Sequence, residues 1–343
     1  MIARSPKGDL GNETKQRTVK NTSRKRGVFV LCYNLFVLDT NTIKRVGILR
    51  GGMGEGYQAS LDRGAELIAH IAQNLSHKYK VIDVFVDRDG VWHLGGLPVN
   101  PADVCHKVDV IWNVADHELS LTIKKFSIPC ISPSAFAQSI EKNDSFFREH
   151  LNNIEVKMPR RMVLPLYQEN FDGPRDLYAI KKAKEVHAKF GAPWIVKSFT
   201  VDKTMGIHLA KTFPELVNAI EDGVNHKKSI LVEEFIEGKI ASLHTLRNFR
   251  NEDLYTFPLG NTYGVFTEGE KKELESIARK LHQHLGAGEY LKSDFVLTPR
   301  RKIYLLGINL HPDLKPKSHF SEVVEQVGAK VHHLVDHILS RVS

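Results

Sequence analysis

Short apolar runs alternate with an amphipathic helical pattern across residues 44–133. The runs RVGILRGG, KVIDVFVD and KVDVIWNVA have the length and apolar content of buried strands, and Ser60–Leu75 repeats its apolar residues at helical spacing. Such an alternation is typical of parallel sheets, because a parallel connection needs a long crossover. The pattern therefore predicts an α/β fold that begins with a small parallel layer.

Two further units follow in an α+β arrangement. Residues 134–225 carry the strand-like runs PRRMVLP and APWIVKSFT among helical patterns. Residues 226–343 carry the strand-like run SILVEEFI, a helix, a hairpin and one closing helical pattern, SEVVEQVGAKVHHLVDHILSRV. We therefore expect three units, 44–133, 134–225 and 226–343.

The first 43 residues form a separate segment. Residues 1–26 are polar and basic, and they precede the apolar run Gly27–Leu38, which is too short to span a bilayer as a helix. A basic stretch before a short apolar run imitates a signal peptide, but no convincing small-residue cleavage site follows it. We favour a disordered tail over residues 1–43, with a secretory signal as the alternative.

The charge and the cysteines restrict the function. A formal net charge of +8 suits an enzyme whose substrates are anionic phosphates and carboxylates. No nucleic-acid recognition motif accompanies the charge, so we expect no nucleic-acid partner and no membrane partner. Cys32, Cys105 and Cys130 lack metal-ligand spacing, which indicates a reducing compartment. We expect a cytoplasmic protein.

Residues 290–318 predict a β-hairpin that carries oxygen ligands. YLKSDFVL and KIYLLGINL flank a turn at Thr298–Arg301. Side chains alternate along a strand, so Lys292 and Asp294 share one face, and Asp294 lies roughly opposite Gly307 and Asn309. One carboxylate and one amide therefore converge. This is the chemistry with which Mg²⁺ holds nucleotide phosphates, although position 307 offers no ligand.

Three motifs precede the hairpin in a fixed order. Lys142 lies in SIEKN, Lys197 follows the apolar run WIV, and Glu233 lies in ILVEEFIEG. A lysine at the end of a strand can contact a phosphate as a compact point charge, and Glu233 can accept from an adenine amino group. Taken separately, each motif has another explanation: a solvated surface lysine for Lys142 and for Lys197, and an exposed strand end for Glu233. For Lys142 we favour that explanation.

The order of these motifs resembles the ATP-grasp superfamily, and within it the D-alanine–D-alanine ligase family. The segment RVGILRGGMGEGYQASLDRGAELI is similar to that family's amino-terminal glycine-rich strand-turn-helix, and INLHPDLKPKS is similar to its closing E-x-N-x-x-P-G segment. The resemblance spans roughly residues 45–343 and implies a three-unit ATP-grasp architecture. It also implies ATP and Mg²⁺ as cofactors, small amino acids as substrates and a homodimer.

The resemblance also assigns residues to nucleotide and metal. It implies that ATP phosphates contact Lys142 and Lys197, and that Asp294 and Asn309 bind Mg²⁺. In the loop DKTMG, which replaces the family's phosphate-covering G-S-S-x-G, the contacts would come from Lys203 and Thr204. Adenine would be held by the side chain of Glu233 and by the backbone of three residues, Glu234, Phe235 and Ile236.

The substrate residues follow from the same resemblance. Lys292 stands where the family carries an arginine that faces phosphate and substrate, and lysine keeps the charge but loses the bidentate fork. Ser318 matches a serine that binds the carboxylate of the second substrate, and the cap of the closing helix explains it equally well. The glutamate that holds the first ammonium is displaced by one position, with Gly56 in register and Glu55 beside it.

Several positions depart from the family pattern. Gly307 replaces the glutamate that bridges the metal ions, which weakens metal binding and charge neutralisation. Ile240 replaces a ribose-binding glutamate, and Asp313 replaces a glycine whose amide would help form the oxyanion hole. Tyr255–Thr267 is shorter than the family's tyrosine-bearing lid loop, so it covers the site less completely.

The sequence therefore predicts an ATP-dependent carboxylate–amine ligase that resembles D-alanine–D-alanine ligase. Its reaction would pass through an acyl phosphate and serve the synthesis of peptidoglycan precursors. One alternative is a catalytically impaired ATP-grasp protein that binds nucleotide without ligating. A second alternative is an ATP-grasp ligase for different amino acids, because the altered lid and Gly56 affect specificity more than fold.

Overall fold

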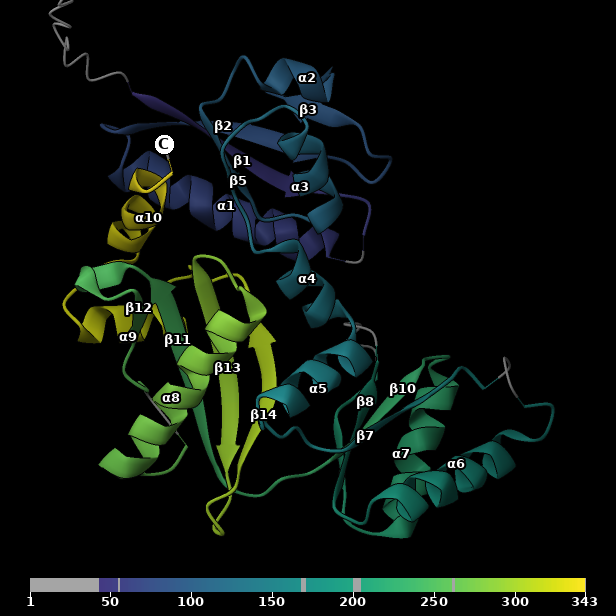
Figure 1. Ribbon diagram of the computed structural model, residues 1–343. Coiled ribbons are helices and arrows are strands. Elements are labelled where there is room, and N and C mark those ends of the chain that lie inside the picture. The colour runs from purple at the N-terminus through teal and green to yellow at the C-terminus, as the bar shows by residue number, and fades with distance from the viewer. Residues whose placement is uncertain (1–42, 55, 168–170, 200–204, 261–262, 343) are drawn as a thin grey trace, which may run out of the picture. The chain divides into compact units, whose positions relative to one another are not determined.

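The computed structural model describes residues 43–54, 56–167, 171–199, 205–260 and 263–342. The predicted tail, residues 1–43, lies outside the described residues except for residue 43. Every described element belongs to the compact unit Ile43–Ser343 (Figure 1). Three sheets organise these elements, two of four strands and one of six.

The first sheet has its strands in the order β4-β3-β2-β1-β5-β6. Its central strands β1 and β2 run parallel, as do β1 and β5 and the edge pair β5 and β6, which confirms the predicted parallel layer. An antiparallel hairpin of β3 and β4, which turns at Gly95 and Gly96, extends the other edge. The strands are β1 (Lys44–Gly51), β2 (Tyr79–Val86), β3 (Trp92–Leu94), β4 (Leu97–Val99), β5 (Val110–Asn113) and β6 (Cys130–Ile131).

Helix α1 covers the first sheet because its apolar residues recur on one face. Leu67 and Ile71 of α1 are buried in the same core as Val46 and Ile48 of β1. Helix α10 from the end of the chain adds Ile338 to this core (Figure 1). The helices of this region are α1 (Tyr57–Asn74), α2 (Pro101–Val104), α3 (His117–Lys124) and α10 (Val331–Ser340).

The second sheet is antiparallel, with its strands in the order β7-β10-β8-β9. Two helices pack on it, and their core includes the fully buried side chains of Tyr178, Trp194 and Ile220. The elements are β7 (Arg161–Leu164), α6 (Arg175–Lys189), β8 (Trp194–Ser198), β9 (His208–Ala210), α7 (Phe213–Asn225) and β10 (Ile230–Glu234).

The third sheet is also antiparallel, in the order β12-β11-β13-β14. Its buried face carries Leu243 and Phe295, which share a core with Ile140, Leu151 and Leu281 of the covering helices. The strands are β11 (Lys239–Arg247), β12 (Leu254–Thr256), β13 (Tyr290–Leu297) and β14 (Ile303–Asn309), with the short 3₁₀ helix η1 (Phe249–Asn251) before β12. The helices are α4 (Ala135–Lys142), α5 (Asp144–Asn153), α8 (Glu268–Leu285) and α9 (His319–Gln326).

The expectation of a single closing helix was wrong. Helix α9 ends at Gln326, and α10 begins at Val331. Gly328 lies between them at φ 72°, a conformation that glycine adopts without the steric cost of a side chain. The break lets α9 pack beside the third sheet while α10 reaches the core of the first.

The predicted unit boundaries at 133/134 and 225/226 stay a prediction. The three sheets and their cores group the elements differently. Strand β10 follows the second boundary but hydrogen-bonds to β7 and β8. Helices α4 and α5 follow the first boundary but share the core of the third sheet. Among the described residues, no helix combines the length and the apolar character needed to cross a membrane.

Candidate nucleotide and substrate site

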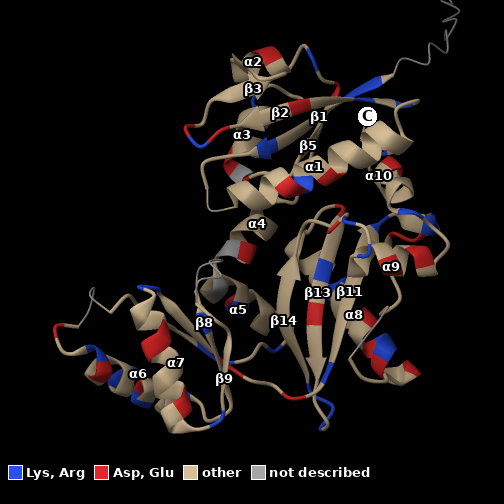
Figure 2. Ribbon diagram, turned by 180° about the vertical axis from the view of Figure 1, so that it is seen from behind, with Lys and Arg blue, Asp and Glu red and all other residues tan. Residues whose placement is uncertain are grey.

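The β13–β14 hairpin has the pairing that the sequence predicts. Asp294 pairs with Gly307, and Lys292 pairs with Asn309. A register irregularity follows between Asp294 and Phe295, where the paired residue shifts from Gly307 to Leu305. Figure 2 shows a basic and an acidic segment on β13, a strand whose sequence YLKSDFVL contains one lysine and one aspartate. The local alternation of side chains was sufficient to place these positions together.

Asp294 is held by two neighbours in the described part of the chain. The Lys292 ammonium lies 3.0 Å from its carboxylate. The hydroxyl of Ser242, which pairs with Asp294 across β11 and β13, donates a hydrogen bond to the same carboxylate. On the returning strand, the Asn309 side-chain oxygen accepts from the backbone N–H of His311 at 2.9 Å. The predicted metal ligands are therefore both engaged in protein contacts.

The β8–β10 edge of the second sheet brings Lys197 to Glu233. The Lys197 ammonium lies 2.6 Å from the Glu233 carboxylate, and the Arg161 guanidinium of β7 lies 3.8 Å from it. Antiparallel pairing causes this arrangement, because β10 lies between β7 and β8 and presents Glu233 to both. The predicted phosphate contact and the predicted adenine contact thus lie side by side.

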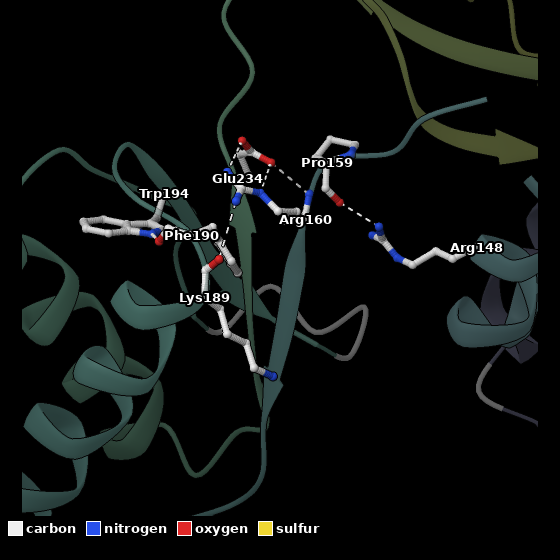
Figure 3. Close-up of polar contacts among 7 residues, drawn as sticks. All are labelled: Arg148, Pro159, Arg160, Lys189, Phe190, Trp194 and Glu234. Atoms are coloured by element: carbon white, nitrogen blue, oxygen red, sulfur yellow. Dashed lines mark hydrogen bonds and ion pairs between the residues drawn. The ribbon is translucent and has the colours of Figure 1, made fainter. Parts of the chain in front are cut away.

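Glu234 makes a bidentate ion pair with Arg160 (Figure 3). The Arg160 Nε and Nη2 atoms donate to the two carboxylate oxygens at 2.9 and 2.8 Å, and the Arg160 backbone N–H donates at 3.1 Å. The guanidinium holds the pKa of the Glu234 carboxyl below its ordinary value of 4.5. The Glu234 side chain therefore stabilises the local structure. The predicted contact with adenine involves only the backbone of Glu234.

The backbone after β10 is fixed at two points and then leaves the sheet. The Glu234 N–H donates to the Arg160 carbonyl at 2.8 Å, and the Phe235 N–H donates to the Pro193 carbonyl at 3.0 Å. Phe235 and Ile236 are half-buried. The predicted adenine-binding segment 234–236 is therefore held in place at its start.

Two stretches of chain connect the second and third sheets. Residues 157–160 hydrogen-bond to both sheets, since the Lys157 carbonyl accepts from Leu305 of β14 and the Arg160 carbonyl accepts from Glu234 of β10. The second stretch runs from Glu234 to Lys239. The Arg160–Glu234 pair joins the two stretches, and the Arg148 guanidinium of α5 donates to the Pro159 carbonyl at 2.8 Å (Figure 3).

A cavity of about 380 Å³ lies at this junction. Its walls include Arg148, Met158, Arg160, Glu234 and Tyr304. They combine apolar surface with basic groups, which suits the binding of an uncharged ring that carries an anionic group. A second cavity of about 210 Å³ is lined by Arg63 of α1, by Asn309 of β14, and by His311 and Asp313.

Ser318 is the cap of α9. Its Oγ accepts from the Ser321 N–H at 3.1 Å and donates to the Asp313 carbonyl at 2.8 Å. This is the structural explanation that the sequence left open beside substrate binding. The side chain of Lys142, at the end of α4, and all of Glu55, Lys203 and Thr204 lie outside what the structure describes.

A pair of histidines, the buried His244 and the half-buried His319, was not predicted from the sequence. His319 Nε2 donates to the Leu259 carbonyl at 3.1 Å, so His319 Nδ1 accepts from His244 Nε2 at 2.7 Å, and His244 Nδ1 accepts from the Tyr290 hydroxyl at 2.7 Å. Burial lowers the pKa of both histidines and raises that of Tyr290. His244 lies opposite Lys292 in the β11–β13 pairing, so this neutral network borders the site.

One signal could have found this pair. The stretch KIASLHTLR, now β11, alternates polar and apolar residues in part, and its recognition as a strand would have placed His244 on the face of Ser242. No local signal pointed to Arg160 or Arg161, because their acidic partners are more than seventy residues away in the chain.

Relatives of known sequence align with most of the chain. A family model described as "D-ala D-ala ligase C-terminus" matches residues 166–340, a little over half of the chain. A D-alanine–D-alanine ligase of Geotalea uraniireducens (strain Rf4) is 22% identical over 325 residues, which are 88% of this chain and 97% of that protein. One from Geobacter sulfurreducens is 23% identical over 312 residues, with coverages of 86% and 93%.

Solved structures show the same fold. D-alanyl-alanine synthetase A from Vibrio cholerae aligns with a TM-score of 0.66 at 16% identity, over 88% of this chain and 98% of that chain. A D-alanine–D-alanine ligase from Bacillus anthracis, crystallised with ATP, aligns with a TM-score of 0.61 at 16% identity, over 87% and 96%. The family model and this shared ATP-grasp fold lead to one conclusion: the chain belongs to the D-alanine–D-alanine ligase family.

Proposed function

We propose that this chain is an ATP-dependent ligase that joins the carboxylate of one amino acid to the amine of another. Its family membership supports this activity. The observation that carries the proposal is the 2.6 Å pair of Lys197 and Glu233, because the family resemblance gives these two positions the phosphate and adenine contacts. D-alanine is the first candidate substrate, since relatives named D-alanine–D-alanine ligase align with 88% and 86% of this chain.

The reaction would have two steps. In the first, an oxygen of the substrate carboxylate forms a bond to the γ-phosphorus of ATP while the bond to the β-bridging oxygen breaks and ADP leaves. In the second, an amine nitrogen attacks the acyl carbon, loses a proton, and displaces phosphate. Positioning and charge neutralisation supply most of the catalysis of phosphoryl transfer.

The basic side chains would do this work. Lys197 would hold the phosphates of ATP from β8, and Lys292 would face the transferring group from β13. Lys142, Lys203 and Thr204 would add contacts to the phosphates. Adenine would lie against Glu233 and the backbone of residues 234–236, beside the cavity at the Arg160–Glu234 junction.

The substrate contacts stay proposals of the same kind. Glu55 would hold the ammonium of the first amino acid, and Ser318 would turn its O–H from the Asp313 carbonyl to the carboxylate of the second while its Oγ still caps α9. We place the reaction in the cytoplasm, in the synthesis of peptidoglycan precursors, with a homodimer as the working form.

Of the proposed cofactors, Mg²⁺ is the one that the described residues fit least. Mg²⁺ prefers octahedral oxygen ligands that include one or two carboxylates. Asp294 is the one carboxylate of the β13–β14 pair, and Lys292 already neutralises it. No group of three acidic, histidine or cysteine side chains suited to a metal exists among the described residues. Asp294 and Asn309 therefore do not form a complete divalent site by themselves.

A second candidate function follows from Gly307. A protein with this fold and without the bridging carboxylate could bind nucleotide and release no phosphate, which is the impaired alternative. A third candidate is a ligase for other amino acids, motivated by Gly56 and by the shortened lid segment Tyr255–Thr267.

Phosphate release separates these candidates. Incubation of the full chain with ATP, Mg²⁺ and D-alanine should release phosphate, and Lys197→Ala should reduce the rate strongly. Release with another amino acid but not with D-alanine would support the third candidate. Measurable ATP binding without phosphate release for any amino acid would reject the ligase proposal in favour of the second candidate.

A further inference from the structure

The β13–β14 hairpin already contains a cation in the place where a metal ion was expected. The Lys292 ammonium lies 3.0 Å from the Asp294 carboxylate, and both side chains are about one-third exposed, at 29% and 32%. Ser242 donates a hydrogen bond to the same carboxylate from β11. The single negative charge of this hairpin face is therefore balanced by a positive charge two residues away on the same strand.

The returning strand adds no charge to this pair. Gly307 lies directly opposite Asp294, and a Cβ atom built on Gly307 would meet nothing within 4 Å. Asn309 lies opposite Lys292, and its uncharged side-chain oxygen accepts a hydrogen bond from the His311 N–H. The sum over Lys292 and Asp294 is zero, whereas a divalent ion needs a surplus of negative ligands.

The β8–β10 edge carries a small excess of positive charge. Arg160, Arg161 and Lys197 contribute three positive charges against the two negative charges of Glu233 and Glu234, a sum of +1. Neither set of paired residues has the excess of carboxylate that attracts a divalent cation, and both offer amines or guanidinium groups to a polyphosphate.

We propose that the Lys292 ammonium takes the place of the resident divalent cation, so that this chain binds the polyphosphate of a nucleotide without requiring Mg²⁺. The inference rests on the proposed nucleotide site and goes beyond it, because it states which cation meets the phosphates. The partly exposed ammonium can turn from Asp294 to a phosphate oxygen that approaches the same face of β13. Asp294 then orients the amine.

The test is a calorimetric titration of the full chain with ATP, in magnesium chloride and separately in EDTA. For the natural chain, we expect the two dissociation constants to agree within about twofold. Gly307→Glu places a second carboxylate opposite Asp294 in open space, so its ATP affinity should become stronger in Mg²⁺ than in EDTA by about tenfold or more. The matched control is Gly307→Gln, which has the same length without the charge and should stay independent of Mg²⁺.

The variant Lys292→Met tests the same proposal independently. It removes the amine and keeps the apolar stem, so ATP affinity in EDTA should fall by about tenfold or more. Mg²⁺ should partly restore the affinity of this variant, because Asp294 is left without its cation. Equal affinity of Lys292→Met and the natural chain in EDTA would overturn the proposal.

The failure of this inference is distinguishable from the failure of the proposed function. A tenfold or greater loss of ATP affinity in EDTA for the natural chain would overturn the inference and keep the nucleotide site. No ATP binding in either buffer would instead reject the nucleotide site itself.

Discussion

The β8–β10 edge and the β13–β14 hairpin differ in how their charges are paired. At the β8–β10 edge, Glu233 has two basic neighbours, and Glu234 has a bidentate arginine from a connecting stretch. On the hairpin, a single carboxylate meets a single lysine from its own strand, and a glycine lies opposite. The first region has three basic groups for two carboxylates, while on the hairpin Gly307 stands where the family resemblance implies a second carboxylate.

If the proposed nucleotide site is correct, this difference separates nucleotide binding from metal binding in the same fold. Basic groups in both regions suit phosphate oxygens, so the loss of a carboxylate changes the cation that the site needs more than the anion that it accepts. Under the proposed function, a change in the number of hairpin carboxylates should therefore affect the binding of a divalent ion more than the binding of ATP.

The largest effect should come from the core side of the hairpin. Phe295 is fully buried beneath the third sheet, whereas Asp294 is on the opposite face. Phe295→Ala should lower the free energy of unfolding by about 3–5 kcal/mol through lost burial and a cavity. Asp294→Asn should change it by less than about 1 kcal/mol. Urea unfolding of both variants tests this, and a similar loss in both would mean that the assigned faces are wrong.

The next effect concerns the β8–β10 edge. Lys197→Ala should weaken ATP binding by about ten- to a hundredfold, because charge-assisted contacts contribute about 1.5–3 kcal/mol. Lys182→Ala is the matched control. Lys182 also forms an ion pair, at 2.8 Å from Glu185, but it lies on α6. Isothermal titration with ATP measures both. An unchanged affinity in Lys197→Ala would return this lysine to the role of a surface residue.

Acid should destabilise the core behind the hairpin sheet. Burial lowers the pKa of His282 from 6.5 to about 4, and its Nε2 donates to the Gly288 carbonyl. The unfolded chain binds this proton below pH 6.5 and the folded chain only near pH 4, so stability falls as pH decreases through that window. We expect His282 to account for about 1–3 kcal/mol of the loss.

Unfolding free energies between these pH values check this prediction. His282→Gln should flatten the pH dependence, whatever its effect on stability at neutral pH. The exposed His77→Gln is the control and should retain the slope of the natural chain. A slope that is unchanged in His282→Gln would contradict the assignment of the buried neutral imidazole.

The smallest effect belongs to the Arg160–Glu234 pair. Arg160 lowers the pKa of Glu234, so the stabilisation is present above the ordinary value of 4.5 and is lost as pH falls through the lower folded value. The Arg160 side chain is 59% exposed, so solvent screening limits the contribution to about 0.2–1 kcal/mol. A double-mutant cycle of Arg160→Ala and Glu234→Gln at neutral and acidic pH measures it, and a coupling that persists in acid would contradict this origin.

The sequence was sufficient for features that depend on local patterns. The alternation of Lys292 and Asp294 and a short turn predicted the hairpin and its pairing, because strand neighbours in a hairpin are close in the chain. The parallel layer followed from apolar runs separated by α1. The family resemblance, which the later comparisons support, came from the order of such motifs.

Features that depend on distant segments were not predictable in the same way. Arg160 meets Glu234 across seventy-four positions, and His244 meets His319 across seventy-five. The break at Gly328 was overlooked because helical periodicity continues on both sides of it. Which surface lysine approaches which carboxylate is decided by sheet order, and sheet order is a property of the whole fold.

Hydrogen-exchange mass spectrometry of the full chain with and without ATP tests the central claim most directly. If one nucleotide contacts both regions, then residues 194–198, residues 230–236 and residues 290–309 should gain protection together, with one dependence on ATP concentration. Lys197→Ala should weaken the protection of all three segments. Protection that is confined to one region, or that appears at different ATP concentrations in the two regions, would contradict a shared nucleotide site.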